Sequence, residues 1–213
     1  GCPIDAMIQR GHGAALLQQH KRLLSVTREL CTGLPDRSVT VKIRTGFRAP
    51  ENKRDSHFLV KKIQQQCFME DSNGRMLGGN LAALFIHGRT RQQRYSKLAD
   101  WSYIAECAKA QDSSLRRIPV IGNGDIFSYQ DWVEKKDFML SALGDDSEQA
   151  CLTDCAMIGR GVLIKPWLPT EIKEQRRWDI SATERMDMLK MYANYGLEHY
   201  GSDSKGVETT RRF

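Results

Sequence analysis

The sequence lacks the features that define several common classes of protein. Its six cysteines are scattered over 213 residues without a C-x-x-C pair, which argues against a structural zinc site and a disulfide framework. No apolar run reaches the length of a transmembrane helix, so we expect no membrane association. We therefore expect a reduced intracellular protein without a bound metal, in the cytoplasm and, as a second compartment, the nucleus.

The first residues lack an initiator methionine. The chain opens on Gly1-Cys2-Pro3, which resembles the end of a strand and its following turn without the strand itself. We therefore expect a fragment whose preceding strands are absent. The lack of a targeting segment then says nothing about location.

Signals for β-hairpins and for solenoid repeats are absent as well. What is present is an alternation of short apolar strands with amphipathic helices, at intervals of roughly forty residues, which is typical of βαβ units and a parallel sheet. The predicted strands are residues 38–44, 81–86, 118–121 and 156–158. We predict an α/β fold: four parallel strands with their helices, the C-terminal part of a (β/α)8 barrel.

The pattern changes after residue 168. A short helix is predicted to begin at Thr170, and Ser181 with Glu184 forms a capping box for a longer helix that ends at Gly201. No further strand follows. We predict two domains: residues 1–168 are half of a barrel, and residues 169–213 begin an α-helical domain.

Two strands run directly into glycine-rich turns. The turns are Gly122-Asn123-Gly124-Asp125 and Gly159-Arg160-Gly161, and each is followed by a predicted helix. Glycine allows close approach of the backbone, and free N–H groups at a helix start favour an anion. In (β/α)8 barrels a phosphate site is commonly built from the loops after strands seven and eight. Ordinary βα turns, in which Asn123 and Asp125 only shape the backbone, remain the alternative.

The loops that follow the strands are basic. In a (β/α)8 barrel such loops lie on the catalytic face. They carry Arg44, Arg48, Lys53, Arg54, Arg89, Arg91, Arg94 and Lys97, whereas the loops before the strands carry Asp71, Asp145, Asp146, Glu148 and Asp154. With a formal net charge of +6, this distribution permits a polyanionic partner, although solvated loops can show such an asymmetry by chance.

Two side chains on the strands could carry chemistry. Lys42 lies on the face of its strand opposite Val39, Val41 and Ile43, so it points into the barrel, where a buried ammonium needs an anion or an electron-rich ligand. His87 stands at the C-terminal end of the next strand, the catalytic edge of a barrel. A structural ion pair for Lys42 and a structural role for His87 are the alternatives.

Five short motifs follow one another along the chain. They are Gly1-Cys-Pro3, Val41-Lys-Ile-Arg-Thr-Gly46, Ile86-His-Gly-Arg-Thr-Arg91, Gly122-Asn-Gly-Asp-Ile126 and Gly159-Arg-Gly161. In this order they resemble the tRNA-dihydrouridine synthases. Residues 165–179 and 195–203 resemble the eukaryotic branch of that family, which acts on the variable loop of tRNA. The similarity extends over nearly the whole chain.

The resemblance implies an FMN-dependent (β/α)8 barrel followed by a helical tRNA-binding domain. Such an enzyme, monomeric when intact, reduces a uridine of tRNA to 5,6-dihydrouridine with NADPH or NADH as reductant. Hydride passes from reduced FMN to C6, and a cysteine protonates C5. The implied proton donor is Cys2. The implied FMN contacts are Lys42, His87, Asn123, Gly124, Asp125, Gly159 and Arg160; Arg44 and Arg89 are candidate substrate contacts, and we add Arg91 and Arg94 as contacts to tRNA phosphates.

The sequence departs from the family pattern in three respects. The first four strands are absent, the helical domain is truncated, and the insertions at residues 71–80 and 144–154 are long. The first two departures lead us to expect that this chain alone holds no FMN. Two other functions remain open: another FMN barrel oxidoreductase acting on a small metabolite, and a non-catalytic RNA-binding protein that retains the fold.

Overall fold

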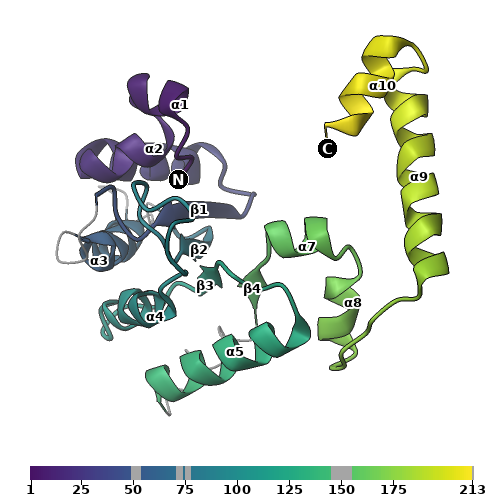
Figure 1. Ribbon diagram of the computed structural model, residues 1–213. Helices are drawn as coiled ribbons and strands as arrows, with labels where there is room; N and C mark the ends of the chain where they lie inside the picture. Colours follow the sequence, from purple (N-terminus) through teal and green to yellow (C-terminus); the bar gives the residue numbers. More distant parts are fainter. Residues whose placement is uncertain (49–53, 71–73, 75–77, 145–154, 213) are drawn as a thin grey trace. The chain divides into compact units, whose positions relative to one another are not determined.

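The computed structural model describes residues 1–48, 54–70, 74, 78–144 and 155–212 (Figure 1). The chain divides into two compact units, residues 1–175 and 176–213, whereas the sequence places a domain boundary after residue 168. Lys53 and the five acidic residues of the predicted charge asymmetry lie outside the described residues, as does most of both predicted insertions.

Four parallel strands form the sheet of the first unit, in the order β1-β2-β3-β4. They are β1 (Val39–Arg44), β2 (Leu81–His87), β3 (Val120–Asn123) and β4 (Ala156–Met157). Successive strands are neighbours with helices between them, which confirms the predicted fold class. β3 begins later than predicted because the side chain of Gln111 binds both the N–H and the carbonyl of Ile118, at 2.7 and 2.9 Å.

The helices of this unit lie beside one another along one face of the sheet (Figure 1). They are α2 (His20–Gly33), α3 (Ser56–Cys67), α4 (Trp101–Lys109) and α5 (Tyr129–Leu143). Two have side-chain caps: Asp100 accepts from the Tyr103 N–H at 3.0 Å, and Ser128 accepts from the Asp131 N–H at 3.1 Å. Before α2 lie α1 (Asp5–Gln9) and the 3-10 helix η1 (Gly13–Gln18).

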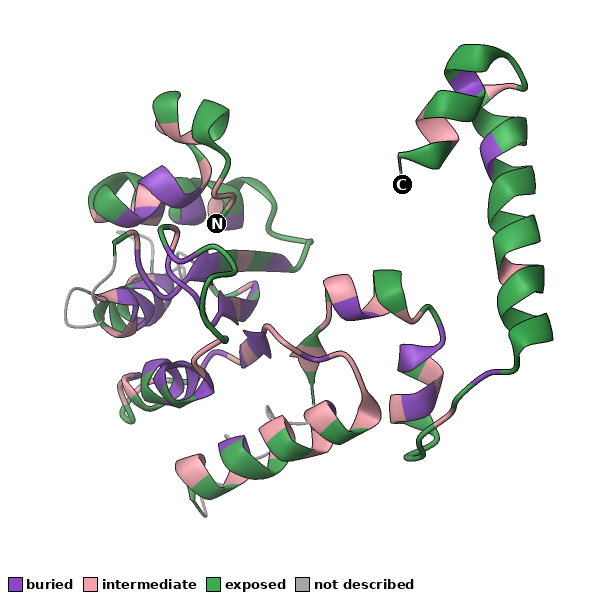
Figure 2. Cartoon of the chain, viewed as in Figure 1, coloured by how far each residue is buried: buried purple, intermediate pink, exposed green. Residues whose placement is uncertain are grey.

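The apolar core lies between the sheet and these helices (Figure 2). Its most deeply buried side chains include Leu59, Ile63, Leu84, Ile86 and Ile104. Val39 and Ile43 of β1 belong to this core, while Lys42 between them is exposed. The period of two along a strand therefore leaves the other face of the sheet to polar side chains.

Two short helices complete the first unit, α7 (Arg160–Ile164) and α8 (Leu168–Lys173). The predicted start at Thr170 is wrong by two residues because Pro169 occupies the first turn of α8, where proline fits a helix. Glu171 of α8 is fully buried and accepts from Lys165 Nζ at 3.0 Å with both oxygens.

The second unit contains α9 (Ala182–Tyr200) and α10 (Ser204–Arg211). The predicted capping box of Ser181 and Glu184 is confirmed, and α9 ends at Gly201 as predicted. α10 packs against α9, and the Tyr192 hydroxyl donates to the carbonyl of Thr210 at 2.7 Å. Within the described ranges, no helix is both long and apolar enough to cross a bilayer.

Candidate active site

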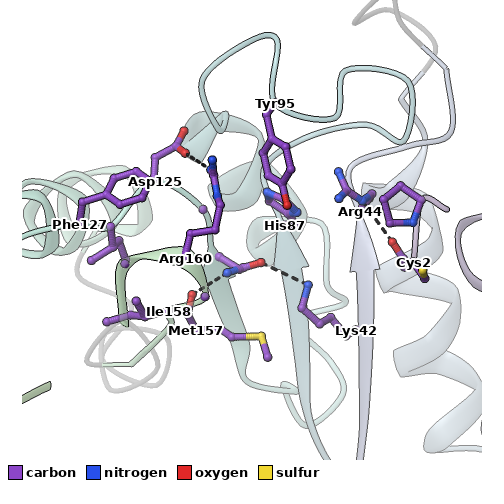
Figure 3. A pocket seen from close by; sticks show the side chains of 17 residues that line it. Cys2, Lys42, Arg44, His87, Tyr95, Asp125, Phe127, Met157, Ile158 and Arg160 are labelled. Carbon is purple, nitrogen blue, oxygen red and sulfur yellow. Dashed lines mark hydrogen bonds and ion pairs between the residues drawn. The ribbon is translucent and has the colours of Figure 1, made fainter. Parts of the chain in front are cut away.

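A cavity of about 410 Å³ opens at the C-terminal ends of the strands (Figure 3). The residues around it come from the N-terminus, from all four strands or the turns after them, and from α7. They include Cys2 and all seven predicted FMN contacts: Lys42, His87, Asn123, Gly124, Asp125, Gly159 and Arg160. The structure therefore brings together in one place residues that are up to 158 positions apart, as the parallel arrangement predicts.

The register of the sheet explains this convergence. Arg44 pairs with His87, His87 with Asn123, and Asn123 with Met157, so one row of residues crosses the four strands at their C-terminal ends. Side chains in one such row point to the same face of a sheet. Here that face is the one turned away from the core, where the cavity lies.

Lys42 lies two residues before Arg44 on β1, on the same face of the sheet, and its side chain reaches this row. Its Nζ donates to Asn123 Oδ1 at 3.2 Å, and Asn123 Nδ2 donates to the carbonyl of Met157 at 2.6 Å (Figure 3). Although Lys42 as a residue is exposed, the protein around its ammonium partly desolvates it, and this desolvation and, second, the nearby Arg44 guanidinium lower its pKa. Its described hydrogen-bond partner is a neutral amide, so its charge stays available to a ligand.

His87 is held as a neutral imidazole. Only 7% of the residue is exposed, and burial, followed by the positive charges of Arg44, Lys42 and Arg89, lowers its pKa to about 3. Arg89 Nη1 lies 3.4 Å from His87 Nε2. Because arginine only donates, this contact assigns Nε2 as the acceptor and leaves the proton on Nδ1.

Asp125 is the acidic group of the cavity wall. It accepts from the Ala99 N–H at 2.7 Å, from Arg89 Nη2 with both oxygens at 2.8 and 2.7 Å, and from Arg160 Nη2 at 3.2 Å. Burial raises the pKa of this carboxyl, but the Ala99 N–H and the two guanidinium groups outweigh burial and lower it. Asp125 therefore stays ionised and fixes the positions of two arginines.

The backbone of Cys2 is held from two sides. Arg44 Nε donates to the carbonyl of Gly1 at 3.1 Å, and the Ala14 N–H donates to the carbonyl of Cys2 at 2.9 Å. Gly13 has a φ of +59°, and a Cβ there would lie 2.7 Å from the Cys2 carbonyl oxygen. The Cys2 side chain is half-buried, with its thiol at the cavity.

The four predicted substrate contacts lie in different places. Arg44 lines the cavity, but its residue is only 4% exposed and its guanidinium binds the carbonyls of Gly1 and Thr90. Arg89 is buried behind Asp125. Arg91 and Arg94 both pair with Asp5, Arg94 at 3.2 Å. Arg94 lines a second, neighbouring cavity of about 520 Å³.

Several residues of the cavity wall were not predicted. They are Gly1, Pro3, Tyr95, Ile126, Phe127, Met157 and Ile158. Tyr95 and Phe127 follow β2 and β3 at some distance, so their position after a strand is the signal that could have identified them. Both rings face the guanidinium of Arg160, with centroids 4.0 and 5.3 Å from its Cζ.

The two glycines that flank Arg160 are expected to respond differently to substitution. A Cβ on Gly161 would lie 2.1 Å from the carbonyl oxygen of Ile126, whereas a Cβ on Gly159 would meet nothing within 4 Å. Gly161→Ala should therefore lower the free energy of unfolding by about 1–3 kcal/mol. Gly159→Ala, the matched control, should change it by less than about 0.5 kcal/mol. Thermal unfolding of both apoproteins checks this, and equal stabilities would contradict the packing described here.

The parallel sheet, its helices and a cavity at the C-terminal strand ends are those of part of a (β/α)8 barrel. Residues 1–212 match the family described as Dihydrouridine synthase (Dus). The chain belongs to that family.

Named proteins similar to this chain come from fungi, plants and animals. The chain is 44% identical to a tRNA-dihydrouridine(47) synthase of Coprinopsis cinerea, whose name carries the qualifier NAD(P)(+). It is 43% and 42% identical to proteins of Oryza sativa subsp. japonica and Homo sapiens that bear the same name with the suffix "-like". Each match covers 100% of this chain but only 28%, 27% and 28% of the relative, so the chain spans about a quarter of their length.

Proposed function

We propose that this chain forms the C-terminal wall of the active site of a tRNA-dihydrouridine synthase. The reaction is the reduction of uridine to 5,6-dihydrouridine in tRNA, at the position 47 that the relatives' names give, with NADPH or NADH as reductant. The observation that carries this proposal is that Cys2, Lys42, His87 and both glycine turns surround one cavity. We expect the intact enzyme to be a monomer of the cytoplasm and nucleus.

The residues around the cavity fit FMN, a ligand with an anionic group and a flat ring. A volume of about 410 Å³ lies in the range of small-molecule sites. The Gly159–Gly161 turn, with Arg160, would hold the phosphate, and open space at Gly159 lets a ligand approach the backbone. Lys42 and His87 would contact the polar edge of the ring. When bound, FMN supplies the hydride that reduces C6 of the uracil.

The protein groups at the other side of the cavity would serve the proton transfer. Hydride addition at C6 leaves negative charge that a proton at C5 must neutralise, and a positioned thiol can act as the general acid. Arg44 and Ala14 fix the backbone of Cys2, so its side chain is presented to the cavity in one direction. We assign Cys2 as that acid.

The tRNA would approach along the loops after the strands. A uridine within folded RNA must leave its stack to reach a cavity of this kind. Arg91 and Arg94 lie in the loop after β2, where they can meet phosphates on either side of the target nucleotide.

The phosphate site is tested by comparing FMN with riboflavin, which lacks the phosphate. In the intact protein, Arg160→Ala should weaken FMN binding roughly ten- to hundredfold, because a charge-assisted hydrogen bond is lost, and should leave riboflavin binding unchanged. Fluorescence quenching of each flavin gives the two dissociation constants. If the ratio of the two constants does not change, the phosphate binds elsewhere and the assignment of this site is wrong.

The proposed RNA surface predicts effects of opposite sign. Arg91→Ala and Arg94→Ala should each weaken tRNA binding and reduce the slope of log Kd against log salt by about one unit per lost phosphate contact. Asp5→Ala, the matched variant, removes the carboxylate that pairs with both arginines and should strengthen binding. Filter binding or anisotropy over a salt series checks this. If the salt slopes of all three variants equal that of the wild type, the tRNA binds to another surface.

A further inference from the structure

Three charged side chains extend in a line from the protein interior to the cavity. Arg89 is 3% exposed and binds both oxygens of Asp125. The side chain of Asp125 is 13% exposed and also accepts from Arg160, whose side chain is 41% exposed. Only the last member of this line, Arg160, presents its guanidinium to a ligand.

The net charge of the line depends on its buried end. Two guanidinium groups and one carboxylate give a net charge of +1, and the bidentate contacts show that Asp125 is compensated mainly by Arg89. Without Arg89, Asp125 and Arg160 would form a neutral pair in a partly buried site, where such attraction is strong. Arg160 would then be a poor ligand for an anion.

Aromatic rings fix the plane of the guanidinium at the exposed end. The ring centroid of Tyr95 lies 4.0 Å from Arg160 Cζ and 5.5 Å from Arg89 Cζ, and the ring centroid of Phe127 lies 5.3 Å from Arg160 Cζ. Figure 3 shows Arg160 between Tyr95 and Phe127, with Asp125 beyond its tip. A guanidinium held in this way loses little conformational freedom when a ligand binds.

We propose that Arg89 is a positioning residue for the anion site: by neutralising Asp125 it leaves the positive charge of Arg160 uncompensated, oriented and available to the phosphate of the cofactor. This inference rests on the proposed FMN site. It differs from the expectation that Arg89 contacts the substrate, because the Arg89 guanidinium is buried and bound to Asp125 and to the carbonyl of Lys97, the latter at 2.6 Å.

The test uses the FMN-to-riboflavin ratio of dissociation constants in the intact protein. Arg89→Ala should raise this ratio roughly ten- to hundredfold, as Arg160→Ala does. Adding Asp125→Asn to Arg89→Ala removes the uncompensated charge and should bring the ratio back to within about threefold of wild type. Arg89→Lys keeps the charge without the bidentate geometry and should give an intermediate ratio. The ratio cancels any effect of Asp125 on the rest of the flavin.

The outcomes separate the inference from the function it rests on. If Arg160→Ala leaves the ratio unchanged, the phosphate site itself is wrong. If Arg160→Ala raises the ratio but the double variant binds no better than Arg89→Ala, Arg89 supports the fold only, and the inference is overturned. Should Arg89→Ala fail to fold, Arg89→Lys is compared with the double variant Arg89→Lys plus Asp125→Asn. The charge balance predicts a lower FMN-to-riboflavin ratio for the double variant than for Arg89→Lys alone.

Discussion

Replacing Cys2 by alanine in the intact enzyme is expected to lower the rate of dihydrouridine formation by roughly two to four orders of magnitude, the range for loss of a general acid. Binding of FMN and of riboflavin should persist, because Cys2 lies at the opposite side of the cavity from Arg160 (Figure 3). The fold should also persist, since Gly1 and Cys2 are held through their backbone carbonyls rather than through the thiol. Single-turnover reduction of tRNA by pre-reduced enzyme is the measurement.

A matched control separates this effect from general loss of a thiol. Cys155→Ala removes an exposed free cysteine that does not line the cavity, and it should leave the single-turnover rate unchanged. Oxidation of NADPH without tRNA should be the same for both variants. A near wild-type rate for Cys2→Ala would show that another group donates the proton.

Replacing Lys42 by methionine is expected to slow reduction of the bound flavin by NADPH roughly 10²- to 10³-fold, the loss found when one preorganised charge-stabilising donor is removed. Methionine keeps most of the apolar stem but cannot donate to Asn123 or stabilise negative charge on a ligand. Stopped-flow absorbance of the flavin gives the rate. Normal flavin reduction in Lys42→Met would place the stabilising cation elsewhere.

The same residue predicts a pH dependence with a definite sign. Partial desolvation and the Arg44 guanidinium lower the pKa of the Lys42 ammonium, so its charge is lost on the alkaline side at a pH below the ordinary lysine range. The wild-type rate of flavin reduction should therefore fall as pH rises through that pKa. Lys42→Arg stays charged throughout and should lack this alkaline limb, even if its absolute rate is lower. If Lys42→Arg shows the same fall in rate at alkaline pH, the titrating group is a residue other than Lys42.

The position of the cavity could be predicted from sequence because it depends on strand ends. Apolar runs that stop at His87, Asn123 and Ile158 mark the edge of a parallel sheet, and side-chain alternation placed Lys42 on the face away from the core. These rules are local, and parallel register brings their results together. Local sequence signals also predicted the cap of α9 and the parallel alternation of strands and helices.

The partners of the arginines could not be predicted in this way. Arg89 meets Asp125 across 36 positions of sequence and Arg91 meets Asp5 across 86, and nothing in their own neighbourhoods indicates these pairs. A basic loop is therefore a poor guide to which guanidinium is free. One of the four predicted substrate arginines is buried behind a carboxylate, and two share one carboxylate at the rim. The partner of a long arginine side chain depends on which carboxylates the fold brings near it, and local sequence does not encode this.

The amide of Asn123 limits how this site can change in evolution. Both ends of the side chain are committed, the oxygen to the Lys42 ammonium and the nitrogen to the carbonyl of Met157. Aspartate, with the same shape, would place an oxygen against that carbonyl, and leucine would remove both of these hydrogen bonds. Neither substitute of similar size preserves both contacts, so few substitutions are tolerated at position 123. Lys42 and the backbone of β4 are consequently bound to one residue type, and a drift in any of the three requires a compensating change in the others.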